Sequence, residues 1–78
     1  MHGNRLVDIT LHVDKDTDTD ERQFLEHGLR RIDGVVSVHI PGNRPHLITI
    51  EYDPDKTQSA HLLDMVQKIA GHSEMIGL

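Results

Sequence analysis

The chain has 78 residues, a formal net charge of −5 and no cysteine. This length predicts one domain, residues 1–78, that buries only about 60–65% of its extended surface and has little room for a deep pocket. Without cysteine there are no disulfides, and nothing argues for an oxidising compartment. With Phe24 and Tyr52 as the only aromatic residues and no basic stripe, binding to nucleic acid or an anionic membrane is disfavoured. No apolar stretch has the length of a signal peptide or membrane span, so we expect a cytoplasmic protein.

The first predicted strand covers residues 6–13, where apolar and polar residues alternate with a period of two. Its apolar positions share one face: Val7, Ile9, Leu11 and Val13. A helix follows an acidic loop, and its apolar residues recur at helical spacing: Phe24, Leu25, Leu29 and Ile32. We expect Thr19 or Asp20 to cap the first turn and Gly34 to end the helix. Gly28 inside the helix costs up to about 1 kcal/mol relative to alanine, and one explanation is close packing against the sheet.

Two more strands are predicted at residues 35–40 and 46–52, joined as a hairpin by a turn rich in proline and glycine. A second helix should begin at a Thr57 cap and end at Gly71, and residues 73–76 should form a short last strand. The apolar residues of that helix are Leu62, Leu63, Val66 and Ile69. The order β-α-β-β-α-β predicts an α+β, ferredoxin-like sandwich, in which a four-stranded antiparallel sheet carries both helices on one face.

Several short pieces resemble, in order and spacing, the heavy-metal-associated domain of copper chaperones over residues 6–78. The matching pieces are Val13, Gly34-Val35, Val38, Ile40, Tyr52-Asp53-Pro54 and Gly71-His72. In that family a Met-x-Cys-x-x-Cys loop opens the first helix, and its cysteines would fall at Asp18 and Glu21 and its methionine at Asp16. Carboxylates are hard ligands and cannot replace thiolates around Cu(I). We therefore expect no copper-chaperone site of the family's kind.

The resemblance also places His72 in a loop beside the family's metal site. Asp18, Glu21 and His72 are thus a candidate site for Zn²⁺, Ni²⁺ or Cu²⁺, with water completing the shell and His2 or His27 in reserve. In the alternative interpretation, the two carboxylates are stabilised by the positive end of a helix, by about 0.3–1 kcal/mol and without a ligand. His72 would then be a solvated loop residue.

The acidic run from Asp14 to Glu21 has an aspartate at every second position, as calcium loops do. An EF-hand would need glycine at Thr19 and glutamate at Leu25, and both requirements fail. Weak association with Ca²⁺ or Mg²⁺ is left open. A solvated acidic loop is the simpler interpretation.

Seven histidines are many for this length, but no two lie three or four apart on a helix. His12 and His39 should share the sheet face that the helices leave open, separated by another strand and by about 9–10 Å. The predicted members of that face are Asp8, Thr10, His12, Ser37, His39, Leu47, Thr49 and Glu51. It can be plain solvent surface or dock a second copy, so we expect a monomer or a weak homodimer. The second strand should lie at an edge of the sheet.

Nothing in the sequence indicates catalysis, because there is no cysteine nucleophile, no Gly-x-Ser-x-Gly elbow and no phosphate-binding glycine loop. Our leading hypothesis is a non-catalytic module that docks a protein partner through Asp16, Asp18 and Glu21 at the start of the first helix. Its acidic surface favours a basic partner and salt-dependent association. The second hypothesis is a carrier or sensor of Zn²⁺, Ni²⁺ or Cu²⁺. A third, a small-molecule sensor that dimerises through its sheets, has no residue pattern in its favour.

Overall fold

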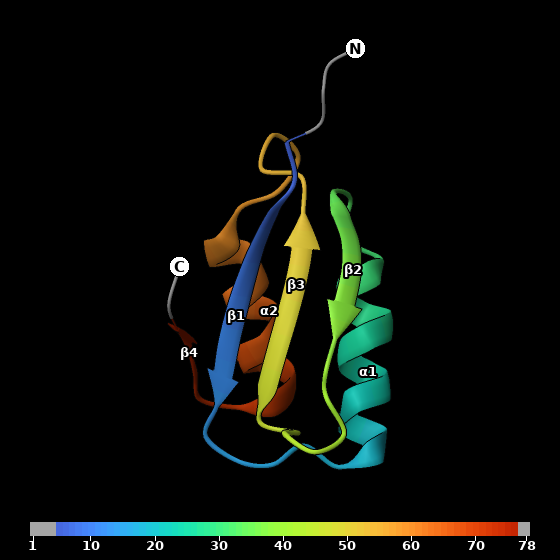
Figure 1. Cartoon of the computed structure of the whole chain (residues 1–78), viewed down its shortest axis with the longest axis vertical. Helices are drawn as coiled ribbons and strands as arrows, with labels where there is room; N and C mark the ends of the chain where they lie inside the picture. Colours follow the sequence, from blue (N-terminus) through green and yellow to red (C-terminus); the bar gives the residue numbers. More distant parts are fainter. Residues whose placement is uncertain (1–4, 77–78) are drawn as a thin grey trace.

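The computed structural model describes residues 5–76. Its elements are β1 (Val7–Val13), α1 (Thr19–Arg30), β2 (Val35–His39), β3 (Leu47–Tyr52), α2 (Ser59–Ala70) and β4 (Ser73–Ile76). One antiparallel sheet has the strand order β2-β3-β1-β4, and both helices cover the same face of it (Figure 1). The predicted ferredoxin-like sandwich is confirmed. Neither helix is long and apolar enough to cross a bilayer within the described residues.

The core lies where the inner face of the sheet meets the two helices. Its fully buried side chains are Leu11, Val13, Leu25, Leu29, Ile48, Ile50, Leu62 and Val66. They follow the period of two along β1 and β3 and the spacing of four along α1 and α2, as amphipathic elements require. Burying each of these side chains stabilises the fold by about 1.5–3 kcal/mol relative to exposure.

The open face of the sheet is polar and internally hydrogen-bonded. The hydroxyls of Thr10 and Thr49 lie 3.3 Å apart between β1 and β3. In the register of the sheet, His12 pairs with Leu47 of β3, and His39 of β2 pairs with Thr49. Since β3 lies between β1 and β2, the two histidines do not meet, as predicted. β2 is an edge strand, also as predicted.

Two predictions about the first helix are wrong. Phe24 is 69% exposed, because the buried stripe of α1 runs through Leu25 and Leu29, and Phe24 lies about 100° around the helix axis from Leu25. Gly28 faces the second helix and not the sheet: a Cβ built there would lie 3.5 Å from Cδ1 of Ile69, which is ordinary van der Waals contact. Close packing against the sheet therefore does not explain this glycine.

The predicted end of the first helix and the cap of the second also need correction. Gly34 has a positive φ (+103°), but in the turn into β2 and not at the end of α1. A Cβ at Gly34 would lie 2.7 Å from Cβ of Lys56, so the turn requires glycine. Thr57 is buried and precedes Gln58, which occupies the N-cap of α2 without a side-chain hydrogen bond. Gly71 closes α2 with φ +88°, as predicted.

Candidate functional site

The loop between β1 and α1, residues 14–18, is anchored by Thr17. This side chain is only 3% exposed, and its backbone N–H and its hydroxyl both donate to the carbonyl of Pro45, at 3.1 and 2.6 Å. Arg22 donates through Nη1 to the Thr17 carbonyl at 2.9 Å and through Nη2 to Oγ1 of Thr19 at 3.2 Å. The loop is thereby tied to the β2–β3 connection and to the first turn of α1.

Asp18 and Glu21 form the N-terminal cap of α1. The N–H of Glu21 donates to Oδ1 of Asp18 at 2.8 Å, and the N–H of Asp18 donates to Oε1 of Glu21 at 3.1 Å. This reciprocal capping box satisfies N–H groups that the helix itself leaves without partners. The prediction of Thr19 or Asp20 as the cap is wrong, because Thr19 is already helical and Asp18 has the extended backbone of a cap, with φ −86° and ψ 176°.

The second oxygen of Glu21 accepts from the ammonium of Lys15. This hydrogen bond lowers the pKa of Glu21 below its ordinary value, and the hydrogen bond from the N–H of Asp18 adds to the effect. In return, the hydrogen bond and the charge of Glu21 raise the pKa of Lys15. Because the pair is at the surface, it stabilises the fold only weakly. Both carboxylate oxygens of Glu21 are therefore engaged within the chain.

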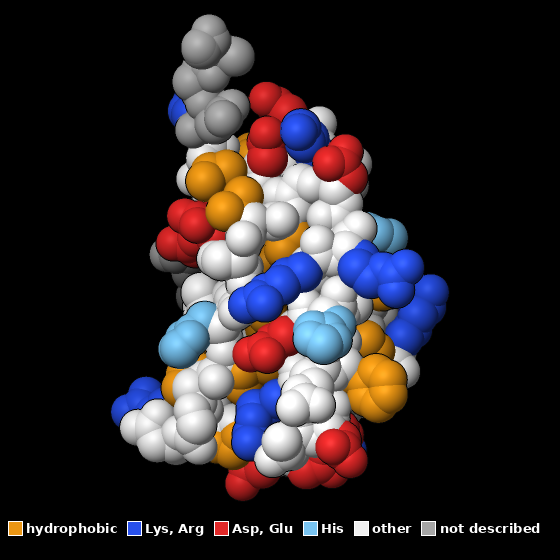
Figure 2. Space-filling model, turned by 90° about the vertical axis from the view of Figure 1, so that its right-hand side faces the viewer, with side chains coloured by type: hydrophobic (Ala, Val, Ile, Leu, Met, Phe, Trp, Pro, Cys, Tyr) orange, Lys and Arg blue, Asp and Glu red, His pale blue; other side chains and the backbone are white. Residues whose placement is uncertain are grey.

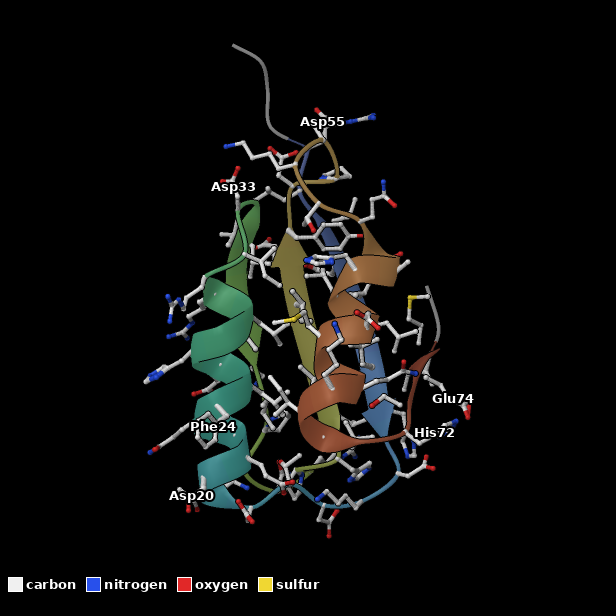
Figure 3. The ribbon with its side chains drawn as sticks, turned by 180° about the vertical axis from the view of Figure 1, so that it is seen from behind. Asp20, Phe24, Asp33, Asp55, His72 and Glu74 are labelled. Atoms are coloured by element: carbon white, nitrogen blue, oxygen red, sulfur yellow. The ribbon has the colours of Figure 1, made fainter. Side chains whose placement is uncertain are left out.

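His72, the third residue of the candidate metal site, contacts the end of β1. Its Nδ1 lies 2.8 Å from Oδ2 of Asp14, whose N–H donates to the His72 carbonyl at 3.1 Å. His72 and the start of α1, marked by Asp20, lie on opposite sides of the same end of the molecule (Figure 3). No group of three or more histidine, aspartate or glutamate side chains within the described residues is placed to hold one ion. A metal ion shared by Asp18, Glu21 and His72 stays a prediction.

The other residues of interest lie apart from one another. His2 lies outside the described residues, and His27 is exposed on α1. Asp16 is exposed, with Oδ1 3.5 Å from Nδ1 of His46. The His46 ring packs edge-on against His12, with ring centroids 5.3 Å apart and an interplanar angle of 72°. Sequence reasoning missed this histidine pair, because no spacing signal links the end of β1 to the residue before β3.

An exposed aromatic side chain lies beside the acidic loop. Phe24, the only phenylalanine of the chain, projects from α1 one turn after Asp20 (Figure 3). The two residues line a shallow hollow of about 290 Å³ together with Gln23 and His27. Figure 2 shows this flank of the molecule, with carboxylates gathered at its lower end and apolar surface above them. Helical spacing alone did not predict the exposure of Phe24, because Phe24 directly precedes the core residue Leu25 and was counted with it among the apolar residues of the helix.

The backbone closely matches metal-binding domains of known structure. A copper-binding domain from HMA7, a P-type ATPase, has a TM-score of 0.78 at 14% identity, covering 90% of this chain and 93% of that one. Oxidized MerP from Ralstonia metallidurans CH34 has a TM-score of 0.79 at 16% identity, covering 94% and 100% of the two chains. The CopZ metallochaperone has a TM-score of 0.73 at 18% identity, covering 90% and 100%. The chain has the heavy-metal-associated fold. No protein-family model and no curated protein matches the sequence, and at these identities the likeness concerns the fold alone.

The loop that opens the first helix of this heavy-metal-associated fold has no soft ligand. The chain contains no cysteine. The resemblance to the heavy-metal-associated family places Asp18 and Glu21 at the positions of that family's two cysteines. Their oxygens are hard donors, and they already accept hydrogen bonds from the helix N-terminus. The residues present therefore do not fit Cu(I).

Proposed function

We propose that this chain is a non-catalytic binding module that docks a protein partner through the start of α1. The docking surface consists of Asp16, Asp18, Asp20, Glu21 and Phe24. The observation that carries the proposal is the exposure of Phe24 on α1, beside the carboxylates of a helix start that contains no soft metal ligand.

Phe24 supplies an apolar anchor for a partner. Its side chain is 69% exposed, although a phenylalanine buries 150–250 Å² in a core or interface and gains free energy by doing so. Aromatic anchors that fill a partner's pocket commonly contribute about 2 kcal/mol or more to binding, which is roughly 30-fold in affinity. The hollow that Phe24 lines beside His27 can accept a side chain of the partner in return.

The charges around this anchor favour a basic partner. Residues 14–22 carry five acidic and two basic side chains. Exposed charges at an interface rim mainly raise the association rate and reject partners of the same sign, and both effects weaken with salt. A positively charged segment with an apolar residue at its centre has the chemistry that this surface complements.

The hydrogen bonds that hold the loop support a docking role. Asp18 and Glu21 cap the helix, and Thr17 and Arg22 hold the loop against the rest of the domain. A surface that is already ordered loses little conformational entropy when a partner binds. The intramolecular bonds also mean that Asp18 and Glu21 should contribute charge to the contact without rearranging.

A photocrosslinking experiment in the source cells tests the proposal. Benzoylphenylalanine placed at Gln23 should crosslink a discrete basic protein, quantified by mass spectrometry. The double variant Asp16→Lys/Asp20→Lys avoids the capping residues and should reduce the adduct about 10-fold or more. Phe24→Ala should reduce it similarly.

The matched control reverses two charges at the opposite end of the molecule. Asp33→Lys/Asp55→Lys changes the net charge by the same amount, and both residues lie far from α1's first turn (Figure 3). This control should leave the adduct unchanged. Equal adducts from the docking and control variants, or no specific adduct at Gln23, would disprove docking at this surface.

The alternative function, transport or sensing of Zn²⁺, Ni²⁺ or Cu²⁺ by Asp18, Glu21 and His72, has less support. The two carboxylates cap α1, and the imidazole pairs with Asp14. Amide NMR shifts during a Zn²⁺ titration distinguish the two functions. Coincident saturable shifts at all three residues would favour the metal carrier.

A further inference from the structure

We propose that His12 and His46 form a binding site for one divalent transition-metal ion at the end of the open sheet face. In this site Asp16 orients the imidazole of His46, and Glu74 supplies a third ligand. Zn²⁺, Ni²⁺ and Cu²⁺ are the ions that suit two imidazole nitrogens and one carboxylate, whereas Cu(I) prefers sulfur and Ca²⁺ prefers oxygen alone.

The spacing of the two rings suits a shared ion. The centroids of His12 and His46 are 5.3 Å apart. Two imidazoles bound to a tetrahedral ion at Zn–N distances of about 2.0–2.1 Å hold their centroids roughly 5 Å apart. In the proposed site the two side chains rotate so that one nitrogen of each ring faces the ion. The His46 side chain is 37% exposed, so an ion and its waters can reach it.

Asp16 prepares His46 for metal binding. Its Oδ1 lies 3.5 Å from Nδ1 of His46. A carboxylate at this nitrogen favours the tautomer with the proton on Nδ1, which leaves the lone pair of Nε2 for an ion. The negative charge of Asp16 offsets part of the charge of the ion.

Glu74 stands next to His12 on the neighbouring strand. The two residues are direct partners in the antiparallel pairing of β1 and β4. Direct partners share a face of the sheet and hold their Cβ atoms about 4.5–5.5 Å apart. Glu74 is exposed and projects from β4 into solvent (Figure 3). Glu74 and His46 lie on opposite sides of β1, and as the side chains stand Glu74 does not converge with the rings. In the proposed site the Glu74 side chain therefore rotates over His12 to reach the ion, with water completing the shell.

Titration of the untagged full chain with ZnCl₂ and NiCl₂ tests the site, with calorimetry and amide NMR as readouts. We expect one ion per chain and saturable shifts centred on His12, His46 and Glu74. His12→Gln and His46→Gln should each weaken binding about 10-fold or more. Asp16→Asn should weaken it about 10-fold, as loss of a partner that orients a ligand typically does.

Two other histidines provide matched controls. His39→Gln removes an imidazole from the same sheet face, and His61→Gln removes an exposed imidazole of α2; neither should change the affinity. The NMR map of the unmodified protein needs no variant, so the test holds even if a substitution perturbs folding. No saturable shift at His12 and His46, or unchanged affinity in their double variant, would overturn the proposal. Docking is tested independently through Phe24→Ala, which leaves both metal-site rings in place.

Discussion

Replacing Asp18 by alanine tests the capping box that closes the start of α1. The change removes the acceptor of the 2.8 Å hydrogen bond from the N–H of Glu21. Loss of an aspartate cap costs about 0.5–2 kcal/mol, and loss of a negative charge at a helix N-terminus costs about 0.3–1 kcal/mol. Because this cap is exposed, water compensates in part, and we expect about 1–1.5 kcal/mol in total. For a domain of this size, the melting temperature should fall by roughly 5–10 °C.

Urea denaturation followed by circular dichroism measures this loss of unfolding free energy. The matched control is Asp20→Ala, which removes a carboxylate from the same helical turn but none of the side-chain hydrogen bonds described for α1. We expect the control to cost only the charge contribution, about 0.3–1 kcal/mol. If Asp18→Ala destabilised the domain no more than Asp20→Ala does, the capping role of Asp18 would be refuted.

Three further predictions address the turn, the loop and the surface ion pair. Gly34→Ala should destabilise the fold by about 2 kcal/mol or more, as measured by urea denaturation. The reason is that Gly34 has φ +103° and that a Cβ there would lie 2.7 Å from Cβ of Lys56. A loss of unfolding free energy under about 0.5 kcal/mol would contradict this. Thr17→Val should cost about 1 kcal/mol in the same assay, since the 2.6 Å hydroxyl bond is lost while its backbone N–H still satisfies the acceptor carbonyl. Glu21 has a folded pKa below its ordinary value of 4.5, mainly because of the hydrogen bond from Lys15. Its contribution is therefore present above pH 4.5 and lost as the pH falls through the folded pKa. Glu21→Gln should show a smaller decline in urea midpoint between pH 7 and pH 3 than the parent, and equal declines would argue against the ion pair.

The amino-acid sequence by itself determined the elements and their order. Alternation of apolar and polar residues predicted β1 and β3, and apolar residues four apart predicted α1 and α2. The reason is that the side chains on one buried face recur every second residue in a strand and every three to four residues in a helix. The order of the elements then left the ferredoxin-like sandwich as the natural arrangement. The absence of cysteine likewise excludes a thiolate site on composition alone, because no fold can supply a ligand atom that the chain does not contain.

Only the tertiary structure decided which side chains meet. His72 pairs with Asp14, 58 positions away in the chain, and not with Asp18 and Glu21. His12 packs on His46, a contact that no sequence interval indicates. Such proximity depends on strand register and on the paths of the loops, which long-range packing sets. Local periodicity predicts on which face of a strand or helix a residue lies. It does not predict which distant residue lies next to it on that face.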